Sequence, residues 1–476
     1  MFSPGQKIYL IGIKGAGMTA LAQVLQTWGC LVSGSDTKEK YFTDEVLRSL
    51  GIKYQEGFAA ANVPAEVDLV VRSAAYAEDH PEVAAALRRG LKVMIYPVAL
   101  AAIVNNAPRS IGIIGSHGKT TSTAMVGALL QEAGLDPTVF VGTRVKQFND
   151  SNALAGRRDL VVAELCEYRR HFLFSKPKYV ILTNIDWDHP DSFPTPADYQ
   201  RAYELFLAQL EPEAVIVYNG DDQNCLAVMR RPEIKNRFAR QISFGFGPAC
   251  DWRAERKMAI GSQNQAKQEF IVWQNNKEFG KFALTLLGEH NVRNALGALI
   301  IALQLGVEKE LAAAVFSTFS GTKRRFEYKG EFNGVSIYDD YAHHPTEIFA
   351  TLKAAKERFF KPKIWCVFQA HTYSRTGALL ADFAKSFLYA DEVIINEVFA
   401  SAREITGADK VDGAKLAAKV QEHQQHTQFI ADFVATAAYL AAKMHPGDIL
   451  ITMGAGDAYQ VADLLLAKNQ EKVLSN

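Results

Sequence analysis

The stretch Ile111-Gly-Ile-Ile-Gly115-Ser116-His117-Gly118-Lys119-Thr120-Thr121 decides the fold of this chain. An apolar run that favours a β-strand leads directly into a glycine-rich turn, and a helix-like run follows the turn. Backbone N–H groups of such a turn and the positive end of the helix can cradle nucleotide phosphates. Lys119 can reach the terminal phosphates, and the Thr120 hydroxyl can bind magnesium. The stretch therefore predicts a phosphate loop, shorter than the commonest G-x-x-x-x-G-K-[ST] form.

The composition is that of a soluble globular enzyme of about three domains. The chain has 476 residues, 48% hydrophobic and 22% charged, with a formal net charge of zero. No basic surplus indicates nucleic acid or a membrane surface as a partner. Five scattered cysteines without C-x-x-C spacing predict neither a disulfide framework nor a zinc site. No apolar run reaches the roughly 18 residues of a membrane span, so we expect no membrane insertion. We also expect a cytoplasmic location and a monomer or weak homodimer.

Three segments in which a predicted strand runs into glycines suggest the openings of three α/β units. The first lies near the N-terminus, the second is the phosphate loop, and the third starts at Asp448. Turn-rich passages predict domains over residues 1–108, 109–324 and 325–476. The expected fold class is α/β, with mainly parallel sheets covered by helices. A Rossmann-like N-terminal domain, a P-loop ATPase-like central domain and a Rossmann-like C-terminal domain would follow one another.

The first glycine cluster, Gly12-Ile-Lys-Gly15-Ala16-Gly17, leaves two kinds of ligand open. Asp36 lies about 20 residues further on, where dinucleotide-binding folds place the acid that binds ribose. However, the order G-x-x-G-x-G matches the dinucleotide fingerprint only loosely. A nicotinamide cofactor, which would indicate a dehydrogenase, and a UDP-linked substrate both satisfy the pattern. A turn with a purely structural role is the third interpretation.

Two polar clusters follow predicted strands of the central domain. They are Glu164-Leu-Cys-Glu167-Tyr-Arg169-Arg170-His171 and Thr183-Asn-Ile-Asp186-Trp-Asp188-His189. Because ligands of a doubly wound sheet gather at the carboxyl ends of its strands, both clusters should face the phosphate loop. Glu164 offers a hard oxygen ligand for magnesium, and His189 can bind a second metal ion or contact phosphate. For Glu167, Arg169 and Arg170, a solvated salt-bridge cluster is an equally good interpretation.

Ordered motifs over essentially the whole chain resemble those of the Mur ligase family. Besides the segments already quoted, they are Ser33-Gly-Ser35-Asp36, Gly288-Glu-His290-Asn291-Val-Arg-Asn294-Ala295, Lys323-Arg-Arg325-Phe326, Asp339-Asp-Tyr341-Ala-His343-His344-Pro345 and Phe368-Gln-Ala-His371-Thr372-Tyr-Ser-Arg375-Thr376. Within the family, the chain is most similar to members that join UDP-N-acetylmuramate to L-alanine. It departs from the usual pattern at Glu167 to His171, at Ser116 and at Thr372, which leaves the reaction class intact.

The resemblance implies an ATP- and magnesium-dependent ligase that forms an amide bond through an acyl phosphate, in peptidoglycan precursor synthesis. The ATP-binding residues it implies are Gly115, Ser116, His117, Gly118, Lys119, Thr120, Thr121, Asn291, Asn294 and Arg325. The metal ligands would be Thr120, Glu164 and His189. The residues that bind UDP-N-acetylmuramate and L-alanine would be Gly15, Ala16, Gly17, Ser35, Asp36, Ser73, Tyr341, His343, His371 and Arg375.

The resemblance further implies a catalytic set of Lys119, Glu164, His189, Arg325 and His343. The three domains are expected to close over the site, because an acyl phosphate open to water would hydrolyse. His344 is as consistent with a structural role as with a functional one. The alternatives are a recycling ligase that adds a tripeptide to the same UDP-sugar, a nicotinamide dehydrogenase and a non-catalytic nucleotide-binding regulator.

Overall fold

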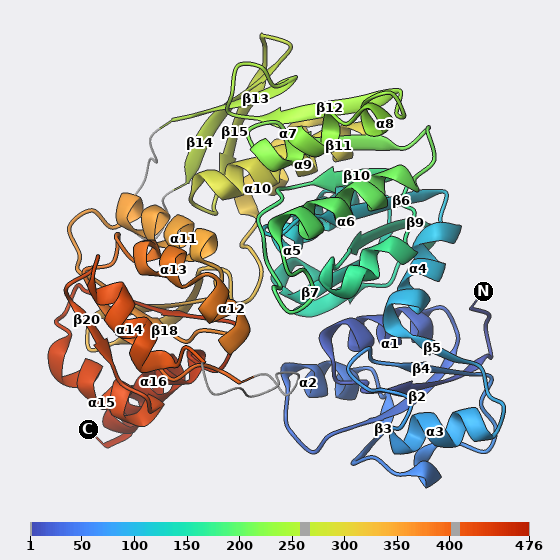
Figure 1. Cartoon of the computed structure of the whole chain (residues 1–476), viewed down its shortest axis with the longest axis horizontal. Helices are drawn as coiled ribbons and strands as arrows, with labels where there is room; N and C mark the ends of the chain where they lie inside the picture. Colours follow the sequence, from blue (N-terminus) through green and yellow to red (C-terminus); the bar gives the residue numbers. More distant parts are fainter. Residues whose placement is uncertain (1, 258–266, 401–409, 476) are drawn as a thin grey trace.

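The computed structural model describes residues 2–257, 267–400 and 410–475. Figure 1 shows three lobes that follow the chain from the N-terminal lobe (blue) through the central lobe (green to yellow) to the C-terminal lobe (orange to red). Each lobe is built on one sheet, of five, ten and six strands. These sheets confirm the predicted α/β class with three domains and mainly parallel strands. The exact boundaries near residues 108 and 324 stay predictions.

The N-terminal domain is a five-stranded sheet in which every pair of neighbouring strands is parallel. Its elements are β1 (Lys7–Ile11), α1 (Ala16–Thr27), β2 (Leu31–Asp36), α2 (Phe42–Ser49), β3 (Lys53–Glu56), η1 (Ala60–Asn62), β4 (Leu69–Arg72), α3 (Pro81–Arg88), β5 (Val93–Ile95) and α4 (Tyr96–Asn106). The strand order β3-β2-β1-β4-β5 puts the buried, apolar β1 at the centre. The first glycine cluster therefore lies at the carboxyl end of the central strand.

The central domain contains the ten-stranded sheet and carries the phosphate loop. Its elements are β6 (Arg109–Ile114), α5 (Lys119–Glu132), β7 (Pro137–Val145), η2 (Lys146–Phe148), β8 (Ser151–Leu154), β9 (Arg157–Glu164), η3 (Tyr168–Phe174), β10 (Tyr179–Leu182), α6 (Pro196–Ala208), β11 (Val215–Asn219), α7 (Gln223–Met229), α8 (Pro232–Lys235), β12 (Arg240–Gly245), β13 (Trp252–Arg256), β14 (Gln268–Gln274), β15 (Lys277–Leu284), α9 (Glu289–Gln304) and α10 (Lys309–Thr318). The order is β15-β14-β13-β12-β11-β10-β6-β9-β7-β8. Because β6 pairs in parallel with both β9 and β10, the three strands end at one edge of the sheet.

The C-terminal domain is a six-stranded sheet flanked by helices. Its elements are β16 (Glu327–Phe332), β17 (Val335–Asp340), α11 (Pro345–Arg358), β18 (Ile364–Phe368), α12 (Tyr373–Ala378), α13 (Leu380–Ser386), β19 (Glu392–Ile395), α14 (Gly413–Gln421), β20 (Thr427–Phe429), α15 (Phe433–Lys443), β21 (Ile449–Met453) and α16 (Tyr459–Ser475). The order is β16-β17-β21-β18-β19-β20. The strand after Asp448, expected to open a unit of its own, is instead the last strand of this sheet, inserted between β17 and β18.

The two outer domains contact the central domain in different ways. Helices α1 and α4 pack against β7, β8 and β9, and buried apolar side chains of both domains form one continuous cluster. Gln23 of α1 donates to Asn152 of β8 at 2.8 Å. The C-terminal domain meets the central domain mainly through polar and charged side chains, together with Trp187, which packs against its apolar core. The nucleotide side of the central sheet therefore faces a polar junction.

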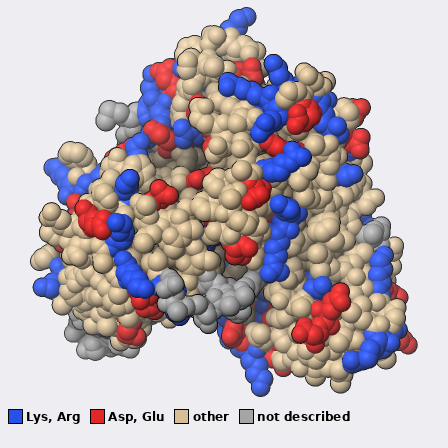
Figure 2. Space-filling model, viewed as in Figure 1, with Lys and Arg blue, Asp and Glu red and all other residues tan. Residues whose placement is uncertain are grey.

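The surface carries both signs of charge. Figure 2 shows Lys and Arg side chains mixed with Asp and Glu side chains on this face of all three domains, in line with the zero net charge. Within the described ranges, no helix is both long enough and apolar enough to cross a membrane.

Candidate active site

The phosphate loop runs from Gly115 to Gly118 between β6 and α5. Gly115 has φ +133° and Gly118 has φ +81°, a backbone region that side chains disfavour. A Cβ at Gly115 would lie 2.0 Å from the Thr183 hydroxyl, and one at Gly118 would lie 2.4 Å from Oδ1 of Asn294. Thr183 also donates to the carbonyl of His117 at 2.7 Å. The loop is therefore held tightly between the end of β10 and helix α9.

Lys119 is buried and already paired. Its Nζ donates to the carbonyls of Gly115 at 2.5 Å and Ser116 at 3.0 Å, and lies 2.9 Å from a carboxylate oxygen of Glu167. Burial lowers the pKa of Lys119, but the acidic groups around it, Glu167 foremost, together outweigh burial and raise the pKa above its usual value. The ammonium group is thus charged and lies against the carbonyls of its own loop.

The solvated cluster considered for Glu167, Arg169 and Arg170 is not found. The Glu167 side chain is only 2% exposed and pairs with Lys119. Arg169 and Arg170 are exposed and adopt φ values of 50° and 59°. Their guanidinium groups lie over the rings of Tyr168 and Phe193 rather than beside Glu167.

Thr120 and Glu164 form a cluster of oxygen ligands beside the phosphate loop. The Thr120 hydroxyl lies 3.0 Å from both carboxylate oxygens of Glu164, which ends β9. The backbone N–H of Gly142 donates to the same carboxylate at 3.0 Å and orients it. A hydroxyl and a carboxylate in this position fit the oxygen preference of magnesium.

His189, the third predicted metal ligand, lies beside Glu167 and Asp188. Its Nε2 is 3.8 Å from Oε1 of Glu167 and 3.7 Å from Oδ2 of Asp188. Its ring faces the ring of Tyr168, with 5.0 Å between the two centroids. His189 therefore lies beside the carboxylate that pairs with Lys119, whereas Thr120 and Glu164 contact each other.

Arg375 joins the third domain to the central domain. It lies in α12, and its guanidinium donates to Asp188 through two nitrogens, at 2.7 Å and 3.2 Å. Each side chain is 5% exposed. Burial tends to raise the pKa of Asp188, but Arg375 and the neighbouring histidines together outweigh burial and hold that pKa well below its usual range. This fork pairs a carboxylate with a guanidinium across the domain junction.

Glu347 of α11 is the centre of a second network across the junction. Its carboxylate lies 3.2 Å from Nη1 of Arg325 and 3.4 Å from Nδ1 of His117. The other ring nitrogen of His117 lies 3.0 Å from Oδ2 of Asp186. Burial lowers the pKa of His117, but the two carboxylates outweigh burial and raise it to about 10. His117 is therefore an imidazolium between two carboxylates at neutral pH.

His344 has a structural role at the start of α11. It caps the helix by accepting the N–H of Thr346 at 3.3 Å, and its Nε2 lies 3.1 Å from the carbonyl of Trp187. His117, Asp186 and His344 bring nitrogen and oxygen atoms within 4.8 Å of one another, as metal ligands can. Asp186 already accepts from His117 at 3.0 Å and from Thr346 at 2.6 Å, so hydrogen bonding accounts for this cluster.

The residues predicted for the alanine side lie together at the third domain's edge. His343 Nδ1 lies 3.0 Å from the carbonyl of Tyr341, and burial lowers the His343 pKa to about 3. The guanidinium of Arg325 lies 5.4 Å from the ring centre of Tyr341. His371 stacks on Phe399 at 5.4 Å. His343 is thus neutral near pH 7, with its Nε2 facing away from that carbonyl.

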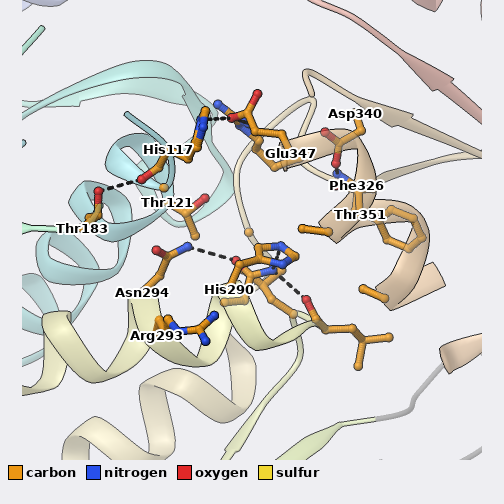
Figure 3. A pocket seen from close by; sticks show the side chains of 18 of the residues that line it. His117, Thr121, Thr183, His290, Arg293, Asn294, Phe326, Asp340, Glu347 and Thr351 are labelled. Atoms are coloured by element: carbon orange, nitrogen blue, oxygen red, sulfur yellow. Dashed lines mark hydrogen bonds and ion pairs between the residues drawn. The ribbon is translucent and has the colours of Figure 1, made fainter. Parts of the chain in front are cut away.

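A cavity of about 860 Å³ opens between the central and C-terminal domains, which suits a nucleotide-sized ligand. Figure 3 shows its walls. Helix α9 contributes His290, Arg293 and Asn294, the third domain contributes Phe326, Asp340, Glu347 and Thr351, and the phosphate loop contributes His117 and Gly118 with Thr121 of α5. The predicted nucleotide residues Asn291 and Arg325 line the same cavity. Burial lowers the pKa of His290 to about 4, so its ring is neutral.

The predicted residues of the N-terminal domain do not line this cavity. Gly15 caps α1, and Ala16 and Gly17 form its first turn, at the carboxyl edge of the sheet. Asp36 ends β2 and is 5% exposed, with its carboxylate accepting the N–H groups of Lys14 at 2.6 Å and Thr37 at 2.7 Å. Ser35 donates to the buried Glu82, and Ser73 follows β4 at the same edge. These residues lie together at the carboxyl edge of the N-terminal sheet, apart from the cavity.

The sequence did not predict the ion pairs that four carboxylates form at the site. Glu167 pairs with Lys119, Asp188 with Arg375, Asp186 with His117, and Glu347 with both Arg325 and His117. The signal for Glu347 was its position four residues after His343, in the first turn of the helix that begins at Pro345. The partners of the other three lie far away in sequence, so no local pattern indicates them.

Comparison with known proteins covers all three domains. Residues 7–107 match the catalytic domain description of the Mur ligase family, residues 113–302 match the Mur ligase middle domain, and residues 324–456 match the Mur ligase glutamate ligase domain. A UDP-N-acetylmuramate–L-alanine ligase of Desulfitobacterium hafniense is 41% identical over 96% of this chain and 99% of its own length. The enzyme of that name from Treponema pallidum is 37% identical over 98% of each chain.

Solved structures give the same result for the fold. The UDP-N-acetylmuramate-alanine ligase of Thermotoga maritima superimposes with a TM-score of 0.80 at 26% identity, over 98% of this chain and 99% of that one. A murein peptide ligase of Psychrobacter arcticus gives a TM-score of 0.71 at 24% identity, over 97% and 98% of the two chains. With three domain matches in order and full-length relatives above 35% identity, the chain belongs to the Mur ligase family.

Proposed function

We propose that this chain is an ATP-dependent ligase that joins the carboxylate of UDP-N-acetylmuramate to the amino group of L-alanine, in peptidoglycan precursor synthesis. The proposal rests on one agreement: the site has the groups that an ATP-dependent ligase needs, and the full-length relatives carry the name of that activity. The phosphate loop, the Thr120–Glu164 cluster and Arg325 surround one junction. Relatives that bear this activity's name match the chain over nearly its full length.

The first half-reaction is phosphoryl transfer from ATP to the substrate carboxylate. A carboxylate does not acylate an amine at neutral pH, so it must first become an acyl phosphate. Phosphoryl transfer depends mainly on positioning and on neutralising charge. Lys119, Arg325 and the His117 imidazolium supply three positive charges next to the loop. Thr120 and Glu164 would hold magnesium, which would supply positive charge for phosphoryl transfer, and His189 would hold a second magnesium ion.

The second half-reaction is attack by the amino group of alanine on the acyl phosphate. The neutral His343 ring can accept a hydrogen bond from the amine through Nε2, because Nδ1 faces the Tyr341 carbonyl. Arg375, whose guanidinium donates to Asp188 and to the carbonyl of His371 at 2.6 Å, would hold His371 in position beside the alanine. Closure of the domains over the site would keep water away from the acyl phosphate and so limit its hydrolysis.

The N-terminal domain is the proposed site of the UDP group. The start of α1 follows the central strand directly, and the N-terminus of a helix attracts a diphosphate. Gly15 to Gly17, Ser35, Asp36 and Ser73 lie at that edge and are the proposed contacts. We also propose a cytoplasmic location, which the five free cysteines support.

The test is release of phosphate from ATP in the presence of UDP-N-acetylmuramate and a panel of amines. Turnover that depends on L-alanine supports the proposal. A response to the tripeptide L-alanyl-γ-D-glutamyl-meso-diaminopimelate alone would instead indicate a recycling ligase. The Lys119→Ala variant is the control for contaminating ATPases.

A further inference from the structure

The cations of the nucleotide site are already paired with carboxylates in this structure. Lys119 is paired with Glu167, and both Arg325 and His117 are paired with Glu347. The Glu347 side chain is 9% exposed, and its carboxylate also accepts the N–H of His343 at 3.2 Å. Burial tends to raise the pKa of Glu347, but the cationic groups facing it hold the pKa well below its usual range. Glu347 is therefore an anion.

Glu347 lies where the phosphates of a nucleotide would compete with it. Glu347, Arg325 and His117 all line the 860 Å³ cavity, at the end formed by the phosphate loop. Figure 3 shows the His117 ring facing the Glu347 carboxylate across the domain junction. A triphosphate in the loop brings further negative charge to the same two cations. Like charges at such short range repel, so Glu347 and the phosphates cannot both be fully paired with Arg325.

The two partners of Glu347 differ in their place in the chain. Arg325 belongs to the same side of the junction as α11, so its pair with Glu347 fixes the arginine beside the cavity. His117 belongs to the phosphate loop, so its pair with Glu347 ties the third domain to the loop. On the loop side His117 stays bound to Asp186 at 3.0 Å. If Glu347 loses its pair with Arg325, its pair with His117 can therefore remain.

We propose that Glu347 is a positioning residue that holds Arg325 and His117 before nucleotide binds, yields Arg325 to the entering phosphate, and keeps the third domain docked through His117. This proposal rests on the proposed ATP-dependent function. The carboxylate thus weakens nucleotide binding by competing for Arg325, and it speeds the chemistry by keeping both cations and the third domain in place.

The test is Glu347→Gln, which keeps the side chain's size but removes its charge. A non-hydrolysable ATP analogue, titrated by calorimetry, should bind roughly fivefold more tightly, because a hydrogen-bonded charge competitor is typically worth about 1 kcal/mol. Steady-state kcat should fall by about 10- to 100-fold, the usual cost of misplaced catalytic groups. A residue with a merely structural role would not tighten nucleotide binding while slowing turnover.

Glu357→Gln is the matched control. Glu357 lies on the same helix and pairs with Arg256 of the central domain at 2.7 Å, outside the cavity. The substitution Glu357→Gln therefore removes an ion pair across the same junction without changing the site. Both the affinity for the ATP analogue and kcat should stay near wild type. A melting curve confirms that each variant is folded.

The result that would overturn the proposal is a folded Glu347→Gln with nucleotide affinity unchanged or weakened, or with wild-type kcat. Equal effects of Glu347→Gln and Glu357→Gln would overturn it as well, because they would indicate general weakening of domain contact. Failure of the proposed function is distinguishable, since the wild-type protein would then show no alanine-dependent turnover.

Discussion

Replacing Lys119 with alanine removes both the catalytic charge of the phosphate loop and the partner of the buried Glu167 carboxylate. The substitution removes the ammonium group that lies against the Gly115 carbonyl and Glu167. Loss of one preorganised donor to a developing charge costs at least about 3 kcal/mol, or roughly 100-fold in turnover. The Glu167 carboxylate, 2% exposed, loses its partner at the same time. An unpaired buried charge destabilises a protein by about 3–5 kcal/mol, so Lys119→Ala should also melt at lower temperature.

A second substitution distinguishes the two effects. In Lys119→Ala/Glu167→Gln the buried carboxylate is neutral, so the melting temperature should recover most of its loss, while phosphate release stays at least about 100-fold below wild type. Phosphate release and thermal denaturation of wild type, single and double variants are the assays. Near-normal turnover of either folded variant would refute the role of Lys119. A melting temperature that Glu167→Gln fails to restore would refute the pairing argument.

Three further outcomes are expected. UDP-N-acetylmuramate should raise the melting temperature by binding the folded chain, whereas NAD and NADP should not; a nicotinamide response would contradict the ligase assignment. Arg375→Ala should lose turnover while its affinity for a non-hydrolysable ATP analogue stays unchanged. Arg375→Lys should not restore turnover, because lysine lacks the two-nitrogen fork that binds Asp188. Wild-type kinetics of either variant would contradict this role of Arg375. Because the pKa of His117 is raised to about 10, its stabilisation is complete below about pH 6.5 and is lost as the pH rises through the folded-state value. The melting temperatures of wild type and His117→Gln should therefore converge over that range, and a constant difference would contradict the ion pairing.

The sequence predicted the parts of the site that short-range patterns encode. The Gly115 to Thr121 stretch could be placed because the turn is bounded by a strand and a helix, and the structure shows β6 and α5 in those places. Glu164 could be predicted beside the loop because parallel strands end at one edge of a sheet. The α/β class followed from alternating apolar strands and amphipathic helices.

The pairing of charges could not be predicted in the same way. Asp188 and Arg375 are 187 residues apart in sequence, yet form one buried pair, and nothing near either residue indicates the other. Glu167 looked like a member of a solvated cluster because two arginines follow it closely. The backbone has positive φ at Arg169 and Arg170, and the side chains of both residues lie away from Glu167. Glu167 pairs with Lys119 instead. Such outcomes depend on tertiary packing, which local pattern does not encode.

In the proposed reaction, the substrate carboxylate is activated as an acyl phosphate before alanine attacks. The measurement that tests it most directly uses UDP-N-acetylmuramate labelled with ¹⁸O in its carboxylate, together with ATP and L-alanine, followed by mass analysis of the released phosphate. Transfer of the γ-phosphate to a carboxylate oxygen predicts one ¹⁸O atom in each phosphate formed from doubly labelled substrate, in step with formation of the alanine amide. Release of unlabelled phosphate alongside amide formation, or release without alanine-dependent product, would contradict the account.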